Sequence, residues 1–248
     1  MAYLKWDEKK ITNFGNENIN AMYDRGFVFT RKGNGIMNQT RSVRIDLSKF
    51  ELSSENRRIS KKTDGLRLTA YDLPYQNYDW EIGKMAKDFY DEKFGEGTFS
   101  ANKIKELLTT EGGNFNKLLI YFSPYQGESE GVVKKSNNGG SKDPSQPPLL
   151  GEEIVGYCIT RESDKILHYS YPFYNLKPKT HKLTPNIGMG MMLRAIEYEK
   201  ENRKKYIYLG SAQRPTDTYK LQFKGLEWFD KDNGWSDKLE ELKSILKS

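Results

Sequence analysis

Four segments between residues 152 and 225 decide the fold: Ile154-Val-Gly-Tyr-Cys-Ile-Thr160, Ile166-Leu-His-Tyr-Ser-Tyr171, Asn186-Ile-Gly-Met-Gly190 and Tyr206-Ile-Tyr-Leu-Gly210. The first, second and fourth are short runs rich in β-branched and aromatic residues, which predict buried strands. The third is a glycine turn at the start of a helical pattern. This order of strands, glycine turn, helix and strand predicts a helix packed against a sheet.

The helix after the glycine turn has one apolar side. Its apolar residues recur at the spacing i, i+3, i+4 and i+7: Met189, Met192, Leu193 and Ile196. This side therefore faces the sheet. Unpaired backbone N–H groups gather at the start of such a helix, with the positive end of the helix dipole behind them. Gly188 and Gly190 are thus candidate residues for binding a phosphate, the alternative being a plain turn.

Composition limits the class of protein. The 248 residues suffice for one large domain or two small ones. Cys158 is the single cysteine, which excludes an intramolecular disulfide or a cysteine-based zinc site and fits a reducing cytoplasm. With no apolar run near the ~20 residues of a membrane helix and no apolar signal segment, we expect a soluble cytoplasmic protein without a membrane partner. The net charge of +6 suits a polyanionic partner, although a lysine-rich surface gives the same charge.

Residues 1–64 predict a strand-rich extension. Residues 1–20 show no regular pattern. A turn that leads into a strand is expected at 22–29 and a second strand at 41–47, with a hairpin-type turn at 31–35 between them. A serine-capped helix is expected at 53–62. One face of this helix is basic: Arg57, Arg58, Lys61 and Lys62. Because no acidic residue interrupts these positions, the face is a candidate contact for a phosphate backbone, the alternative being a solvated charged face.

Residues 65–248 predict a larger domain of helices on a sheet. Further strands are expected at 66–71, 117–122 and 225–229. Further helices are expected from Asp79, from Ser100 to Gly112-Gly113 and from Asp237, with a helical or turn segment at 216–223. The polar stretch 123–150 predicts a flexible loop. The predicted fold class is α+β, with a mixed central sheet flanked by helices.

No motif for a catalytic nucleophile is present. The chain lacks a Gly-x-Ser-x-Gly elbow, a P-loop and a His-Glu-x-x-His sequence, and only His168 and His181 could serve as imidazole bases. His168 lies in a strand pattern, where a core role is more frequent than catalysis. Acyl transfer to an amine needs no covalent intermediate, however, if the protein aligns the acyl donor with the amine and binds the oxyanion. Positioning would then supply most of the catalysis.

Several short motifs follow one another along most of the chain: Asp24-Arg-Gly-Phe27, Ser42-Val-Arg-Ile45, Phe50-Glu-Leu-Ser53, Asn56-Arg-Arg58, Tyr206-x-Tyr-x-Gly210, and Tyr219-Lys220 with Phe223. In this order they resemble the arginyl- and leucyl-tRNA-protein transferases, and the elements from Leu66 to Phe229 resemble the GNAT acyltransferase fold. The resemblance implies transfer of an amino acid from a charged tRNA to the N-terminus of an acceptor protein. It also implies aminoacyl-tRNA as co-substrate without another cofactor, and we expect a monomer.

The chain departs from the family at three places. The cysteine cluster that usually precedes the Val-Arg-Ile strand is replaced by Met37-Asn-Gln-Thr40, so no metal is expected. Pro185 stands where acetyl-CoA-dependent GNAT enzymes have Gln or Arg, which favours another acyl donor. Ser211-Ala-Gln-Arg-Pro215 also differs from the family pattern, so the transferred amino acid is left open.

The candidate site residues follow from the strand pattern and the resemblance. The catalytic candidates are Tyr171, Tyr219 and Lys220; the substrate-binding candidates are Tyr169, Gly188, Gly190, Ser211 and Phe223; the tRNA-binding candidates are Arg25, Arg57, Arg58, Lys61 and Lys62. Tyr169 and Tyr171 are expected on one face of their strand, where they would line an acyl channel. Two other functions stay open: a coenzyme A dependent GNAT N-acetyltransferase and a non-catalytic RNA-binding module of the same fold.

Overall fold

The computed structural model describes residues 4–123, 153–177 and 186–247. Its centre is an eight-stranded sheet in which the β8–β9 pair is parallel and every other pair is antiparallel. In spatial order the strands are β11 (Gly234–Ser236), β10 (Leu226–Asp230), β4 (Ser42–Asp46), β9 (Tyr206–Ser211), β8 (Ile166–Tyr174), β7 (Ile154–Glu162), β6 (Lys117–Phe122) and β5 (Arg67–Asp72). The predicted α+β class with a mixed sheet is confirmed.

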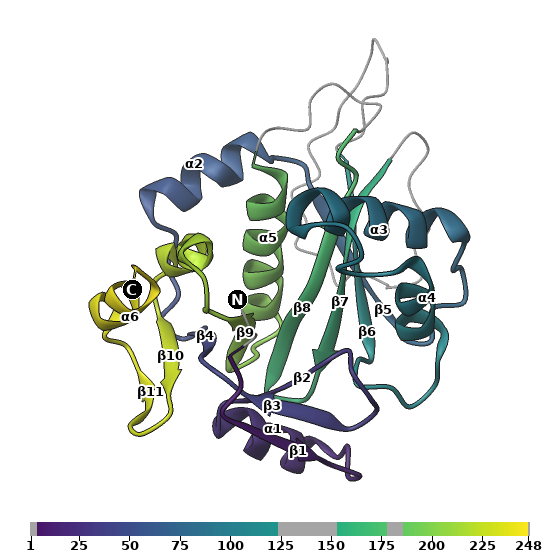
Figure 1. Ribbon diagram of the computed structural model, residues 1–248. Coiled ribbons are helices and arrows are strands. Elements are labelled where there is room, and N and C mark those ends of the chain that lie inside the picture. The colour runs from purple at the N-terminus through teal and green to yellow at the C-terminus, as the bar shows by residue number, and fades with distance from the viewer. Residues whose placement is uncertain (1–3, 124–152, 178–185, 248) are drawn as a thin grey trace.

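Helices cover both faces of this sheet (Figure 1). One core lies under α2 (Ser54–Lys62), α5 (Ile187–Glu201), α6 (Leu239–Lys247) and the 3-10 helix η1 (Pro215–Gln222); the other lies under α1 (Asn16–Asp24), α3 (Trp80–Phe94) and α4 (Ala101–Thr109). Strand β6 serves both cores because its residues alternate between the faces. Leu119 and Tyr121 join the first core, and Leu118 and Ile120 join the second. No helix in the described ranges is long and apolar enough to cross a bilayer.

The predicted starts of α2, α3 and α4 are confirmed, and each of these three helices has a side-chain cap. Ser53 accepts a hydrogen bond from the backbone N–H of Asn56 at 3.1 Å, and the Asn56 side chain bonds back to the Ser53 N–H. Asp79 caps α3 and Ser100 caps α4 in the same manner. Helix α4 ends at Thr109, before the predicted glycine pair.

The N-terminal region contains more regular structure than expected. Within residues 1–20, predicted to be irregular, lie β1 (Asp7–Lys10) and the start of α1, and the strand expected at 22–29 is confined to β2 (Phe27–Phe29). Strand β1 has the sequence Asp-Glu-Lys-Lys, which contains no apolar residue and therefore shows no strand-like alternation. It is mostly exposed and is held by backbone hydrogen bonds to β3 (Ile36–Gln39). The turn at 31–35 joins β2 to β3, whereas β4 belongs to the central sheet.

The predicted domain boundary at residue 64 separates elements that pack closely against each other. Strand β4 pairs with β9 and β10, and α2 packs against α5, so residues before 64 take part in the central sheet and in one of its helical layers. Two separate domains therefore stay a prediction. The loop expected at 123–150 falls, after Ser123, outside the described residues.

Candidate functional site

Strands β8 and β9 separate halfway along their length. They pair only from Ile166 to His168 with Tyr206 to Tyr208, yet β8 continues to Tyr174 and β9 to Ser211. We call the region between their unpaired ends the opening. Gly188 at the start of α5 lies beside Tyr174 at the end of β8, and Lys220 of η1 binds Ser211 at the end of β9, so these three predicted residues lie at the ends of the two strands.

A β-bulge in β8 changes the orientation of the predicted channel residues. In the pairing of β8 with β7, Tyr169 lies opposite Thr160 and Tyr171 lies opposite Ile159. Ser170 therefore has no partner in β7 and forms the bulge. Tyr169 consequently belongs to the core under α5, beside Tyr121 and Cys158, whereas Tyr171 packs with the opposite core. The prediction that Tyr169 and Tyr171 share a face was wrong, because strict alternation fails at a bulge.

Three of the sequence motifs meet at Arg44, which is buried in β4. Its Nε donates to Glu227 Oε2 at 2.9 Å, and its Nη1 donates to Asp24 Oδ1 and to the Tyr208 hydroxyl, both at 3.1 Å. The guanidinium also lies 3.7 Å from the ring centre of Tyr206 and 3.9 Å from that of Trp235. Burial acts against its charge, but Tyr208 and Glu227 outweigh burial and raise the pKa of Arg44. This cluster ties α1, β4, β9 and β10 together behind the opening.

His168 is buried, at the last position where β8 pairs with β9. It is 3% exposed, and its Nδ1 shares a hydrogen bond of 2.8 Å with the Tyr23 hydroxyl. Burial, assisted by the positive charge of Lys220, lowers the pKa of His168 to about 3. The imidazole is therefore neutral at physiological pH, as expected of a core histidine.

Lys220 and Ser211 meet where β9 ends. The Lys220 Nζ donates to the Ser211 carbonyl oxygen at 2.8 Å and lies 3.9 Å from Asp217 Oδ1. Burial lowers the pKa of Lys220. The Ser211 hydroxyl accepts a hydrogen bond from Gln213 Nε2 at 2.8 Å. Two polar side chains thus fix the backbone at the edge of the opening.

Tyr219 precedes Lys220 but is 44% exposed. Loss of water around its hydroxyl, with smaller contributions from Asp217 and Tyr174, raises the pKa of Tyr219 to about 12. The hydroxyl therefore keeps its proton at neutral pH and can donate a hydrogen bond. Phe223, by contrast, is buried and packs against Phe50 with ring centres 6.5 Å apart, as a core residue does.

Tyr174 lies beside the predicted residue Gly188, and the sequence prediction did not include it. It ends β8, and its ring centre lies 4.7 Å from that of Phe89 in α3. A Cβ at position 188 would lie 3.0 Å from its Cε1 atom and 3.5 Å from its hydroxyl. Gly188 therefore leaves room for Tyr174 beside the first turn of α5. Extending the predicted strand beyond Tyr171 would have found this residue.

Gly190 has a packing role of its own. A Cβ at this position would lie 2.5 Å from Cγ2 and 2.8 Å from Oγ1 of Thr63, the residue that ends α2. The Gly190 N–H is bonded to the Asn186 carbonyl at 2.9 Å within the helix. This N–H is therefore engaged, and phosphate binding by Gly188 stays a prediction.

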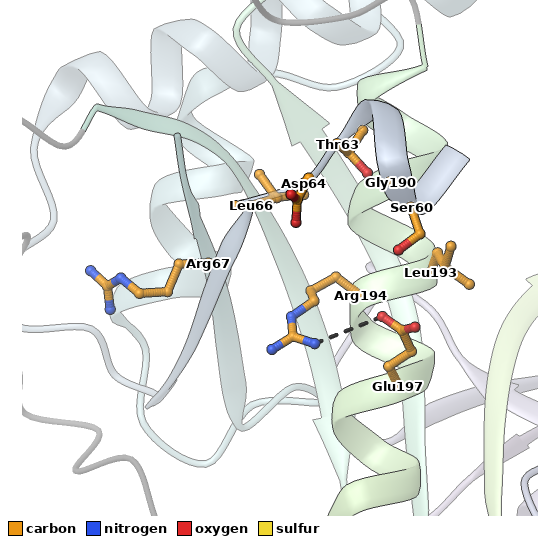
Figure 2. Close-up of a pocket in the computed structure, with 10 residues that line it drawn as sticks. Ser60, Thr63, Asp64, Leu66, Arg67, Gly190, Leu193, Arg194 and Glu197 are labelled. Atoms are coloured by element: carbon orange, nitrogen blue, oxygen red, sulfur yellow. Dashed lines mark ion pairs between the residues drawn. The ribbon is translucent and has the colours of Figure 1, made fainter. Parts of the chain in front are cut away.

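A polar pocket of ≈ 320 Å³ lies between α2, β5 and α5, on the α2 side of Gly190. Its charged residues are Asp64, Arg67, Arg194 and Glu197. Figure 2 shows Arg194 directed toward Glu197, and the Arg194 Nη1 lies 3.7 Å from the Glu197 Oε2. The Arg67 guanidinium points away from this pair (Figure 2) and stacks over the ring of Phe122 at 4.2 Å. Burial raises the pKa of Glu197, although the positive charge of Arg194 opposes the shift.

The predicted RNA-binding residues fall into two groups. Glu55, which lies just before these positions, accepts two hydrogen bonds of 2.5 and 2.6 Å from Arg58, so an acidic residue that the prediction did not consider neutralises one cation of the basic face. Arg57 donates to the Leu52 carbonyl at 2.7 Å. Within the described ranges Arg57, Lys61 and Lys62 have no carboxylate within ion-pair distance. Arg25 ends α1, which lies at the opposite end of the molecule from α2 (Figure 1), so the structure does not bring Arg25 to that face.

The described residues contain no group of three or more His, Cys, Asp or Glu side chains arranged to hold a metal ion. Cys158 is buried, and burial raises the pKa of its thiol. A buried protonated thiol is a poor nucleophile and a poor metal ligand.

No family model matches. The chain is 25% identical over 190 residues to the aspartate/glutamate leucyltransferase of Paracoccus denitrificans, covering 75% of this chain and 60% of that protein. It thus spans less than two thirds of that protein's length.

Two solved structures are similar at lower identity. L-PGS from Bacillus licheniformis gives a TM-score of 0.45 at 12% identity, covering 94% of this chain and 71% of that one. The GCN5-related glucosamine N-acetyltransferase region of a fungal β-N-acetylglucosaminidase gives 0.40 at 7% identity, covering 86% and 22%. The similarity to a leucyltransferase confirms the resemblance to the aminoacyl-tRNA-protein transferases that the sequence motifs predicted.

Proposed function

We propose that this protein transfers the aminoacyl group of a charged tRNA to the N-terminal amine of an acceptor protein. The observation that carries the proposal is the similarity to a leucyltransferase over 190 residues. The name of that relative couples a leucyl group with aspartate or glutamate, so an acceptor that begins with either residue is the first one to test.

The opening between β8 and β9 supports this proposal. An aminoacyl ester could enter between the two strands, where β9 is fixed by the hydrogen bond from Lys220 to Ser211 and the start of α5 lies close by. Unpaired N–H groups at the helix start favour the oxyanion that develops on the ester carbonyl. Asn186, which precedes this helix, makes no side-chain cap to those N–H groups.

The reaction needs one bond made and one broken. The nitrogen of the acceptor amine forms a bond to the ester carbonyl carbon. The single bond between this carbon and the ribose oxygen breaks, and the ribose oxygen takes a proton. Tyr219 is the candidate to supply that proton because its hydroxyl is a hydrogen-bond donor on an exposed side chain directly before Lys220. The ammonium of the acceptor must lose protons before and during attack, and water can accept them. Lys220 acts in this proposal as a positioning cation next to the ester.

The RNA contacts proposed for α2 fit beside this site. Lys61 and Lys62 lie at the end of α2 next to Thr63 and Asp64, which line the pocket that also holds Arg194. Position 190 of that pocket is two residues from Gly188 at the opening. A single-stranded RNA end could therefore reach the opening past this pocket, with its phosphates against Lys61, Lys62 and Arg194.

The experiment is a transfer assay with a tRNA pool charged with radiolabelled amino acids and a protein whose first residue is Asp or Glu. We expect label in the acceptor protein and none when its N-terminus is acetylated. Acetyl-CoA serves as the competing donor in a parallel reaction. Transfer from acetyl-CoA without transfer from any aminoacyl-tRNA would refute the proposal.

A further inference from the structure

Helix α3 carries a row of exposed side chains next to the end of β8. Trp80, Lys84, Asp88 and Glu92 recur every four residues, so they lie along one side of the helix. Trp80 is 68% exposed, although it is a large apolar side chain of the kind that usually packs in a core or an interface. The row borders a cavity of ≈ 460 Å³ between α3 and residues 175–177.

Charges of both signs line this cavity. Lys84 is engaged with Asp88, whose Oδ2 lies 2.5 Å from its Nζ. Glu81, Glu92 and Lys177 also line the cavity, and none of them has an ion-pair partner within residues 4–123, 153–177 and 186–247. The cavity therefore offers uncompensated carboxylates together with one uncompensated ammonium group.

Ring contacts connect the cavity with the opening between β8 and β9. Phe89 lines the cavity and packs against Tyr174. Tyr174 occupies the space beside Gly188 at the start of α5. Burial raises the pKa of Tyr174, and the negative charge of Glu92 raises it further, which agrees with a carboxylate near that hydroxyl. Phe89 and Tyr174 thus lie between the cavity and the start of α5, where the acyl group would be transferred.

We propose that this cavity holds the N-terminal residue of the acceptor polypeptide. Glu92 faces the α-ammonium group, Lys177 faces an acidic side chain, and Trp80 packs against the residues that follow. The inference rests on the proposed function and specifies how the acceptor is recognised. A terminal Asp or Glu carries one ammonium and one carboxylate, which complement the free carboxylates and the free lysine of the cavity.

The charge of the cavity argues against RNA as its occupant. Glu81, Asp88 and Glu92 oppose the two lysines, so carboxylates are in excess. A phosphate backbone requires an excess of cations and gains nothing from a lining of this kind. RNA is therefore better suited to the α2 side of α5 and the polypeptide to the α3 side.

The test measures binding of a fluorescent peptide to the full chain without tRNA. Three peptides differ only at the first residue: a free N-terminal Asp, an acetylated Asp and a free Asn. Each cavity variant has a control at an exposed residue outside the cavity: Glu92→Gln with Glu96→Gln, Lys177→Gln with Lys93→Gln, and Trp80→Ala with Phe94→Ala. Thermal unfolding of each variant verifies that the fold is intact.

We expect the wild type to prefer the free Asp peptide over both others. Trp80→Ala should weaken its binding about tenfold, as loss of an exposed aromatic anchor does. Glu92→Gln should abolish the preference for the free amine, and Lys177→Gln the preference for Asp over Asn, each a change of ~3–5-fold. The controls should bind like the wild type.

Unchanged peptide binding by Trp80→Ala and Glu92→Gln, or no binding of any of the peptides by the wild type, would overturn the acceptor assignment. The outcome is separate from that of the transfer assay. Peptide binding that responds to these variants supports the cavity as the acceptor-binding site even if no aminoacyl-tRNA acts as a donor. Aminoacyl transfer by variants with unaltered peptide affinity would exclude the cavity as that site and leave the proposed function intact.

Discussion

The Nζ of Lys220 donates a hydrogen bond of 2.8 Å to the carbonyl oxygen of Ser211, at the end of the strand that separates from β8. Both residues were candidates from the sequence, but only the structure joins them. The bond brings a buried cation to the edge of the opening between β8 and β9 and fixes the backbone there.

Replacement of Lys220 tests the proposed reaction site. Lys220→Met removes the cation and leaves the Ser211 carbonyl without its partner, so kcat/KM for aminoacyl transfer should fall by roughly a hundredfold or more. Lys224→Met is the matched control, because Lys224 is exposed and pairs with Glu51 on the surface. Steady-state kinetics with both variants provide the measurement. Equal activity of Lys220→Met and Lys224→Met would exclude a role for Lys220.

Glu199 gives a test of stability against pH. It is 1% exposed on α5, and burial, together with the charge of Glu162, raises its pKa to about 8 although Lys204 and Lys117 oppose the shift. Because the folded pKa exceeds the unfolded one, the contribution of Glu199 to stability is fully present below the unfolded pKa. It is lost as pH rises toward 8, as the buried carboxyl is forced to ionise.

Glu199→Gln should remove this dependence. We expect the variant to exceed the wild type in free energy of unfolding by roughly 1–3 kcal/mol at pH 9, with a smaller difference at pH 5. Glu201→Gln, at the exposed end of the same helix, should leave the pH dependence unchanged. Urea unfolding at several pH values measures both. If the difference in free energy of unfolding between Glu199→Gln and the wild type does not vary with pH, the raised pKa of Glu199 is contradicted.

Gly190 tests the close approach of α2 to α5. In Gly190→Ala the new methyl group would meet the Thr63 side chain at 2.5–2.8 Å, so the two helices must move apart. We expect a loss of about 1–3 kcal/mol in the free energy of unfolding, of the size usual for overpacking. In a background that carries Thr63→Gly, Gly190→Ala should cost less free energy of unfolding than it does in the wild type. An additive double variant would show that the contact does not limit the packing.

Lys61 and Lys62 test the proposed RNA surface. The double variant Lys61→Ala, Lys62→Ala should weaken tRNA binding, and the slope of log Kd against log salt should decrease by about one for each phosphate contact that is lost. Arg58→Ala is the informative control, because Glu55 already neutralises Arg58 and its removal should have a smaller effect. Equal effects of the double variant and the control would contradict this distinction.

The sequence predicted the elements that depend on local patterns. Apolar periodicity located α3, α5 and the strands of the central sheet other than β11, and the side-chain caps at Ser53, Asp79 and Ser100 marked three helix starts. It failed at β1, whose exposed Asp-Glu-Lys-Lys sequence is held by backbone pairing that leaves no side-chain pattern.

The site was only partly predictable for a related reason. Lys220 and Ser211 could be named from a motif, but the bulge at Ser170, which turns Tyr169 and Tyr171 to opposite faces, depends on pairing between strands. Likewise, the pairing of Arg58 with Glu55 was readable from their spacing but was overlooked. The cavity beside α3 depends on the distant residues 175–177, so no local pattern could reveal it.

The most direct measurement of the central claim is the mass of the acceptor's N-terminal peptide after incubation with this protein and a fully charged tRNA pool. The acceptor begins with Asp or Glu, and deacylated tRNA provides the blank reaction. We predict a mass increase of one amino-acid residue on the N-terminal amine, dependent on charged tRNA and absent with Lys220→Met. An unmodified N-terminus with every charged tRNA, or an acetyl group added from acetyl-CoA alone, would contradict the account.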